Sequence, residues 1–196
     1  MRMQGTHTRQ PYPDIAECFQ SGWDLYKREP VLLSGATLLV GILNAIAGSI
    51  PFAGLLTSGP LLAGLYLLII ALRNDENPGI ASVFDGYQHF LPVLIASVLI
   101  SVFVSVGLFL LVLPGIYAAV VYGFTILNIV RKGLDFWPAM ELSRTTITPI
   151  FWHYLIFAFL MLLILIAGAI PFALGLLVAV PVCLAAQLHF YEQLDC

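Results

Sequence analysis

Three long apolar stretches alternate with short polar segments along this chain of 196 residues. Each stretch holds two apolar runs of about 20 residues, the length that an α-helix needs to cross the hydrocarbon core of a bilayer. The pattern therefore predicts an all-α integral membrane protein with six transmembrane helices. These helices are expected at roughly 30–50, 52–72, 91–113, 115–131, 149–170 and 172–190.

Proline spacing predicts how the six helices are paired. Prolines recur in pairs that are 21 or 22 residues apart, namely Pro30 and Pro51, Pro92 and Pro114, and Pro149 and Pro171. A proline in the first turn of a helix removes a donor that the helix does not use, so each pair marks two helix starts. We predict three hairpins with short uncharged turns, and kinks at Pro60 and Pro181 where the middle hairpin carries Gly123. A chance spacing of prolines is the alternative.

A short amphipathic segment precedes each predicted hairpin. Their aromatic or apolar faces are Ile15, Phe19, Trp23 and Tyr26; Ile80, Phe84 and Tyr87; and Trp137, Met140 and Ile147. Asp14 and Asp135 are placed to cap the first and third segments. Aromatic-rich amphipathic helices beside membrane spans usually lie in the headgroup plane. We therefore predict a threefold internal repeat of interfacial helix plus hairpin.

The repeats define one membrane domain over residues 14–192, with copies at 14–73, 80–131 and 135–192. Residues 1–13 are predicted to be a disordered N-terminal tail, and residues 193–196 a C-terminal tail. Residues 1–30 are mixed polar, so the first apolar stretch is expected to act as its own insertion signal.

Charge is scarce and confined to the polar segments. The chain is 60% apolar and 10% charged, whereas a soluble domain is about 25% charged. All eight Lys and Arg residues lie in the flanking segments and none lies in the predicted hairpin turns. The positive-inside rule then places both termini in the cytoplasm. The net charge of −3, without a basic run, argues against nucleic acid as a partner.

The sequence contains no catalytic or cofactor signature that would predict an enzyme. The three cysteines are odd in number and scattered, so they predict neither disulfides nor a zinc site. No Asp, Glu, Lys or Arg lies near the middle of a predicted span, which argues against proton coupling and against hydrolysis inside the membrane. We predict no catalytic residue, no metal and no cofactor.

Histidines near the predicted cytoplasmic interface were weighed as a metal or proton-handling cluster. These are His89, His153 and His189. Imidazole is a suitable ligand, but the spacing forms no known metal motif, and ordinary interfacial residues are the favoured interpretation. An enzyme acting on lipid headgroups through His89, His153 and Glu141 is the least favoured hypothesis.

Mildly polar side chains inside the predicted helices form a candidate polar path. The path residues are Asn44, Ser97, Ser101, Ser105, Thr125 and Gln187, and Asn128 is of the same kind. Such residues either line a path or form hydrogen bonds between helices, worth about 0.6 kcal/mol each in lipid. Small residues recur at four-residue spacing in the same helices, which favours packing.

Aromatic and basic residues beside the spans are candidate contacts for lipid headgroups. They are Trp23, Lys27, Arg28, Arg131, Lys132, Trp137, Arg144 and Trp152. A cation near an anionic surface contributes about 1 kcal/mol. An internal pair between Glu141 and Arg144 is an alternative to a lipid contact for that arginine.

Two motifs carry a family resemblance. One is Leu-Pro-Gly-Ile-Tyr at 113–117, and the other is Lys132-Gly133 followed by Trp137, Ala139-Met140-Glu141 and Ser143-Arg144. The chain resembles uncharacterised bacterial polytopic membrane proteins with domains of unknown function. It is more loosely similar to the membrane domain found with glycerophosphoryl diester phosphodiesterases, whose chemistry belongs to a separate soluble domain. The resemblance implies a bacterial inner-membrane protein and carries no activity.

The favoured function from sequence is a non-enzymatic membrane protein that binds or organises lipids, or scaffolds other membrane components. Membrane lipids are the expected partners, with a homo-oligomer or a membrane protein partner also compatible. The alternative is a passive channel or transporter subunit for a small neutral or amphiphilic solute.

Overall fold

The computed structural model describes residues 12–49, 53–110, 112–170 and 174–194. Every regular element in these ranges is helical: α1 (Ile15–Arg28), α2 (Pro30–Gly48), α3 (Ala53–Arg73), the 3-10 helix η1 (Ile80–His89), α4 (Phe90–Leu110), α5 (Val112–Val121), α6 (Thr125–Lys132), α7 (Phe136–Ile147), the short 3-10 helix η2 (Thr148–Ile150), α8 (Phe151–Ala169) and α9 (Leu176–Gln193). Six helical segments are long and apolar enough to cross a membrane. The predicted all-helical membrane class is confirmed at this level.

The helix starts follow the sequence signals. Asp14 caps α1 by accepting a hydrogen bond from the Ala16 amide at 2.9 Å, and Asp135 caps α7. Pro30 is the first residue of α2, and Pro114 lies in the first turn of α5. Because a capping oxygen or a proline satisfies or removes donors without partners at a helix N-terminus, these predicted starts have a direct physical cause. The predicted turn prolines Pro51 and Pro171 lie outside the described residues.

Ordered contacts occur close to both predicted domain boundaries. Tyr12 stacks on the His153 ring at 5.3 Å, and the His153 Nε2 lies 2.7 Å from the Pro13 carbonyl oxygen. These two contacts fix the chain before the predicted start at residue 14. At the other end α9 continues through Gln193, whose side chain contacts His189 one turn earlier. The N-terminal contacts leave no local sequence signal because His153 and Pro13 are 140 positions apart, and the domain boundaries at residues 14 and 192 stay predictions.

The fourth predicted span is interrupted. We expected one helix over 115–131, but α5 ends at Val121 and α6 begins at Thr125. The Gly123 amide bonds to the Val120 carbonyl at 3.1 Å, a tight turn in place of the helical pattern. A side chain at Gly123 would overlap the Tyr154 hydroxyl. Glycine at this point lets α8 approach the break closely.

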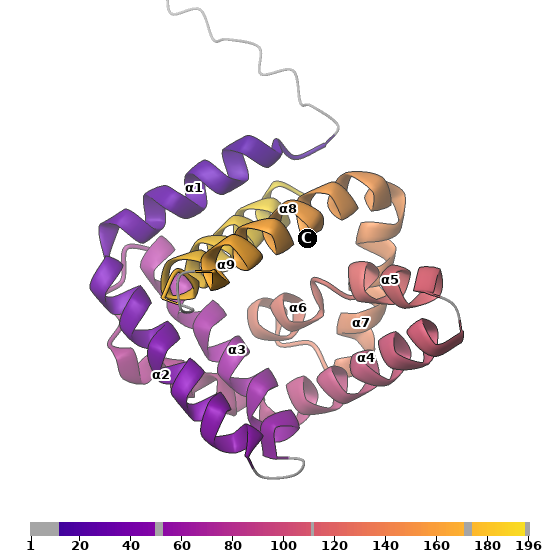
Figure 1. Ribbon diagram of the computed structural model, residues 1–196, viewed down its shortest axis with the longest axis horizontal. Coiled ribbons are helices and arrows are strands. Elements are labelled where there is room, and N and C mark those ends of the chain that lie inside the picture. The colour runs from indigo at the N-terminus through magenta and orange to yellow at the C-terminus, as the bar shows by residue number, and fades with distance from the viewer. Residues whose placement is uncertain (1–11, 50–52, 111, 171–173, 195–196) are drawn as a thin grey trace, which may run out of the picture.

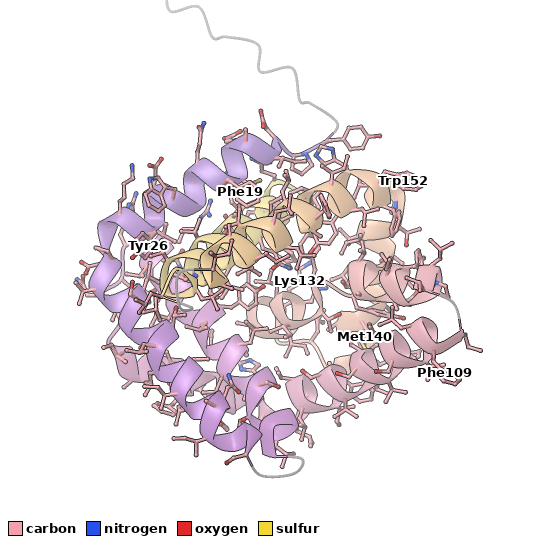
Figure 2. The ribbon with its side chains drawn as sticks, viewed as in Figure 1. Phe19, Tyr26, Phe109, Lys132, Met140 and Trp152 are labelled. Atoms are coloured by element: carbon pink, nitrogen blue, oxygen red, sulfur yellow. The ribbon has the colours of Figure 1, made fainter. Side chains whose placement is uncertain are left out.

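The spans divide into an outer and an inner set. In Figure 1, α2 and α4 lie along the rim of the view and α3 and α6 lie inside it, while α8 overlaps α9. Figure 2 shows Phe109 at the end of α4 and Trp152 at the start of α8 projecting outward, with exposed fractions of 93% and 75%. By contrast, most residues of α9 from Ala179 to Tyr191 are buried.

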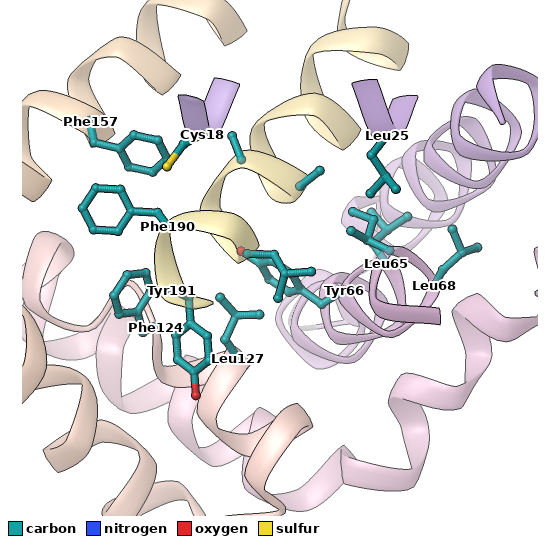
Figure 3. Packing of buried hydrophobic residues seen from close by; sticks show 14 of the residues in the cluster. Cys18, Leu25, Leu65, Tyr66, Leu68, Phe124, Leu127, Phe157, Phe190 and Tyr191 are labelled. Carbon is teal, nitrogen blue, oxygen red and sulfur yellow. The ribbon is translucent and has the colours of Figure 1, made fainter. Parts of the chain in front are cut away.

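Aromatic packing around α9 forms the centre of the core (Figure 3). The Phe157 and Phe190 rings lie 4.7 Å apart. Phe124, the last residue of the break, meets Tyr191 edge-on at 5.3 Å and Tyr154 at 4.9 Å. Edge-to-face pairs of this kind stabilise beyond the area they bury, so α6, α8 and α9 are held around the interrupted span.

The helix α1 packs on α9 through small residues. A side chain at Gly22 would lie 2.5 Å from the Val182 carbonyl oxygen, so the two backbones nearly touch there. Cys18 is fully buried in the same contact, and burial raises the pKa of its thiol to about 12. Trp23, on the predicted aromatic face of this segment, is 46% exposed.

The other two amphipathic segments show the same arrangement. In η1, Val83 and Gly86 are buried against α3 while Phe84 and Tyr87 are exposed. In α7, Met140 and Ile147 are buried as predicted, together with Ala139 and Ser143, whereas Trp137 is exposed. The small residues allow close helix contact, and that leaves the large aromatic rings on the outside.

Candidate functional site

A buried glutamine links four spans at the centre of the molecule. Gln187 on α9 accepts a hydrogen bond from the Tyr66 hydroxyl of α3 at 2.8 Å. Its amide nitrogen donates to the Gly123 carbonyl in the break between α5 and α6 at 2.9 Å, and to the Tyr154 hydroxyl of α8 at 3.1 Å. One side chain therefore satisfies a carbonyl that the interruption removed from the helix.

A buried serine supports the other side of the break. The Ser143 hydroxyl on α7 donates to the Val121 carbonyl at 2.7 Å and accepts from the Phe124 amide at 3.1 Å. An unsatisfied backbone group away from water costs several kcal/mol, so irregular backbone inside a membrane needs such partners. Gln187 and Ser143 together account for the stability of the interruption.

A second polar chain runs from the interior towards the charged helix ends. The Tyr191 hydroxyl donates to Asn128 at 2.9 Å, and the Asn128 amide donates to the Ala139 carbonyl at 3.0 Å. The Arg131 guanidinium lies over the Tyr191 ring, 5.8 Å from its centroid. Glu192 then bonds both Arg131 and Arg73 at 2.8 Å, which ties together the ends of α3, α6 and α9.

A cavity of about 330 Å³ lies between the spans beside this network, and we call it the central cavity. Its lining residues are Leu62, Tyr66, Gly123, Ile126, Met161, Leu165, Val180, Cys183, Leu184 and Gln187. Small-molecule sites typically have about 300–1,000 Å³ and mostly apolar walls with a few polar groups. The central cavity fits this description, with its polar groups supplied by Gln187, Tyr66 and the Gly123 backbone.

The lining of the central cavity is uncharged. Its lining includes no formally charged side chain and no histidine. Cys183 is its one thiol among the lining residues, and it is buried with no neighbouring base in the lining. Uncharged donors and acceptors at one end of an apolar space match a molecule with an apolar chain and a neutral polar group.

The candidate path residues differ in their relation to the described cavities. Gln187 lines the central cavity. Two further cavities are described, an apolar groove of about 440 Å³ beside α2 and a polar cavity of about 510 Å³ under α1. The other five path residues line none of these three cavities. Asn44 accepts a hydrogen bond from Thr57 at 3.4 Å, between α2 and α3. Ser101 bonds back to the Ser97 carbonyl of its own helix.

The two remaining path residues lie in opposite environments. Ser105 is exposed on α4. Thr125 is fully buried at the start of α6, and its hydroxyl has no hydrogen-bond partner among the described residues. The path residues thus lie in several different environments among the described residues.

The candidate headgroup contacts fall into two groups. Trp23, Trp137 and Trp152 are exposed, as a role at the membrane interface requires. Most of the cations are paired with carboxylates: Lys27 with Asp24, Arg28 with Asp75, Arg131 with Glu192 and Arg144 with Glu141. The last pair confirms the internal alternative for Arg144. Lys132 forms no ion pair within the described part of the chain.

The three interfacial histidines lie in three separate environments. His153 contacts Pro13, His189 contacts the Arg73 guanidinium, and the His89 Nδ1 is buried with no partner among the described residues. Within the ranges that the structure describes, no group of three or more His, Cys, Asp or Glu side chains is placed to hold a metal ion.

Sequence reasoning missed the partners that complete the site. Tyr66 and Tyr154 were not selected, and Ser143 was noted only as part of a family motif, yet all three contact Gln187 or the break. A signal was present, because three spans have lower mean hydropathy than the other three. The less apolar spans are those that can turn polar groups away from lipid.

Comparison with protein-family models, with curated proteins and with solved structures gave no match. The resemblance to bacterial polytopic membrane proteins therefore stays a prediction, and the candidate site rests on its own geometry.

Proposed function

We propose that this is a non-enzymatic integral membrane protein that binds a neutral amphiphilic lipid in the central cavity. The observation that carries the proposal is a cavity with apolar walls and one uncharged polar end between four spans. The apolar chain of the ligand lies along Leu62, Met161 and Leu165. Its polar group lies at Gln187 and Tyr66, which already form hydrogen bonds with each other.

The uncharged lining of the central cavity favours a neutral amphiphile over an ionised one. A carboxylate or ammonium group placed in the central cavity would lose its hydration without meeting an opposite charge from the lining. A hydroxyl or an ester exchanges hydrogen bonds with Gln187 at much lower cost. Neutral lipids such as long-chain alcohols or glycerides are therefore favoured over ionised fatty acids.

The interrupted span supports the same assignment. Discontinuous helices in membrane proteins are tolerated where they line a cavity, and they commonly provide backbone groups to a bound molecule. Gly123 lies at the break and lines the central cavity. The channel alternative has less support, because the path residues share none of the described cavities.

For topology, we propose a bacterial inner-membrane protein with both termini in the cytoplasm, built from three repeats of interfacial segment plus hairpin. The family resemblance supports the location. The ion pairs that join the ends of α3, α6 and α9 support a common charged face. The order outer span then inner span, which occurs three times along the chain, supports the repeat.

Binding is tested by titrating the purified, delipidated protein with dodecanol and counting bound molecules by native mass spectrometry. We expect one saturable dodecanol per chain, and much weaker binding of dodecanoate and dodecane. Leu165→Trp fills the cavity and is expected to abolish binding. Leu162→Trp, on the same helix but exposed, is the matched control and keeps binding.

Equal dodecanol binding by the two tryptophan variants would contradict the proposal, as would non-saturable uptake by the wild-type protein. Orientation is tested separately with a membrane-impermeant maleimide on intact cells. Since Cys18 and Cys183 are buried, labelling reports Cys196. We expect labelling only after the inner membrane is opened, and labelling of sealed spheroplasts would reverse the topology.

A further inference from the structure

A second cavity of about 510 Å³ lies where α1 crosses the charged ends of α3 and α9, and we call it the interfacial cavity. Its lining residues are Glu17, Gln20, Ser21, Asp24, Leu25, Arg28, Arg73 and His189. The α1 members recur at intervals of three or four residues, so they lie on one face of that helix. The cavity is separate from the central cavity, which shares none of these residues.

The two arginines of the interfacial cavity keep N–H donors that are not engaged in their ion pairs within the protein. Arg73 makes its contacts to Glu192 and His189 through Nη2. Arg28 makes its ion pair with Asp75 through Nη1 at 3.0 Å. A guanidinium has five N–H donors in a planar fork, so each arginine keeps donors for a phosphate.

Carboxylates stand beside these arginines in the same cavity. Glu17 lies 3.8 Å from the His189 ring that contacts Arg73, and Asp24 is one helical turn from Arg28. The lining holds two arginines and two carboxylates, so its formal charge cancels with His189 neutral, and Asp24 also pairs with Lys27, which is not among the lining residues, at 2.8 Å. A balanced, charge-separated cavity is complementary to a ligand that is itself neutral overall with separated charges.

We propose that the interfacial cavity binds a zwitterionic phosphodiester headgroup that carries a primary ammonium. The phosphate lies against Arg28 and Arg73, and the ammonium donates hydrogen bonds to Glu17 and Asp24. A quaternary ammonium is usually recognised by aromatic faces, and the lining includes no aromatic residue. The carboxylates instead accept N–H donors, which selects ethanolamine over choline.

The position of the cavity points to a membrane source for the headgroup. Trp23 and Tyr26 stack at 5.6 Å on α1, and Trp23 is exposed. Exposed aromatic residues beside membrane spans are typical of the headgroup level. The proposal does not rest on the central cavity, because none of its groups contacts the dodecanol site.

To test this, the full-length protein is placed in nanodiscs that contain equal parts of dioleoyl-phosphatidylethanolamine, -phosphatidylglycerol and -phosphatidylcholine. Native mass spectrometry then identifies the lipids that stay bound to the protein. We expect phosphatidylethanolamine to be retained several-fold over both others. Equal retention of the three lipids, or a preference for phosphatidylglycerol, would overturn the proposal.

Substitutions test whether the preference for phosphatidylethanolamine arises at the interfacial cavity. Glu17→Gln with Asp24→Asn removes the ammonium partners and is expected to abolish the preference over phosphatidylglycerol. Lys132→Gln, which alters a charge outside the cavity, is expected to keep it. An unchanged preference in the double variant would contradict the assignment. Both variants should still bind one dodecanol, so this result is distinguishable from a failure at the central cavity.

A binding experiment with a soluble headgroup compound tests whether the ligand is a membrane lipid or a free headgroup. Glycerophosphoethanolamine is added to the delipidated protein in detergent, and its binding is compared with that of the whole lipid. Binding of the lipid alone supports a membrane ligand. Binding of both that is lost in the Glu17→Gln, Asp24→Asn variant supports the same site with a free headgroup as a second ligand. Binding of neither contradicts the proposal.

Discussion

The outer and inner spans of this protein have similar lengths but opposite surroundings. The most apolar windows of the segments that contain α4 and α8 have mean hydropathies of 2.8 and 2.5, and few of their residues are buried. The values for the segments of α3 and α9 are 1.6 and 1.2, and more than half of those residues are buried. The span with the weakest membrane signal, α9, therefore lies at the centre.

The outer and inner spans differ in hydropathy because the outer spans contact lipid and the inner spans contact other helices. A span in contact with lipid cannot expose polar groups without a large cost, whereas an inner span can satisfy them against other helices. Gln187 on α9 has three such hydrogen bonds, and Ser101 on α4 bonds only to its own backbone. In this protein low hydropathy marks the helices that build the candidate site.

The largest expected effect comes from removing the central glutamine. Gln187→Leu leaves the Gly123 carbonyl and two tyrosine hydroxyls without their partner, and we expect a loss of about 2–4 kcal/mol in the free energy of unfolding. Ser101→Ala on the outer α4 is the matched control, and we expect a change below about 0.5 kcal/mol. Unfolding by SDS in mixed micelles measures both. Equal losses would break the distinction between inner and outer spans.

Glycines give the next largest contrast. A side chain at Gly64 on the inner α3 would overlap the Val83 backbone of η1, whereas nothing lies within 4 Å of the same position at Gly41 on α2. Gly64→Ala should cost about 1–3 kcal/mol through overpacking. Gly41→Ala should be neutral, or stabilising by up to about 1 kcal/mol through helix propensity. The same SDS titration compares the two, and a harmless Gly64→Ala would contradict the packing of η1 on α3.

Ion pairs should show a smaller contrast of the same kind. Glu192 joins arginines from two inner spans and is partly buried, while the Glu141–Arg144 pair lies on one exposed turn of α7. We expect Glu192→Gln to cost about 1 kcal/mol and Glu141→Gln close to nothing. Raising the salt concentration should reduce the difference. The opposite order would show that Glu192 does not hold α3 and α6 together.

The smallest effect concerns reactivity. Burial raises the pKa of Cys18 to about 12, so its thiolate is scarce at any pH near neutral. In a Cys183→Ala, Cys196→Ser protein we expect no maleimide labelling from pH 7 to 9 while the protein is folded, and rapid labelling after unfolding. Since the folded thiol keeps its proton longer, its contribution to stability is present below the unfolded pKa and is lost as the pH rises through the folded pKa. Rapid labelling of the folded protein would contradict the packing of α1 on α9.

Much of the helical organisation could be predicted because it depends on local signals. Apolar length located the six spans, and Asp14, Pro30 and Asp135 marked helix starts through capping and first-turn chemistry. These effects involve residues within a few positions of each other. These local effects can therefore be predicted from a single sequence.

The candidate site could be predicted only in part because it depends on distant partners. Gln187 was selected as a polar residue within a span, but its contacts with Tyr66 and Gly123 join residues more than 60 positions apart. The break at Gly123 was equally hidden, because Ser143 stabilises it from another helix. The side of α1 that packs against α9 could not be predicted either, because contacts of Gly22 and Cys18 with a distant helix determine it.

The most direct test of the central claim is a map of which spans contact lipid. A phosphatidylcholine with a diazirine on its acyl chain is incorporated with the protein into nanodiscs, and labelled peptides are quantified after photolysis. We predict several-fold more label on residues 90–110 and 151–169 than on 176–193, despite the similar lengths of these helices. Equal labelling of the three helices would contradict the division into outer and inner spans, and with it the central cavity.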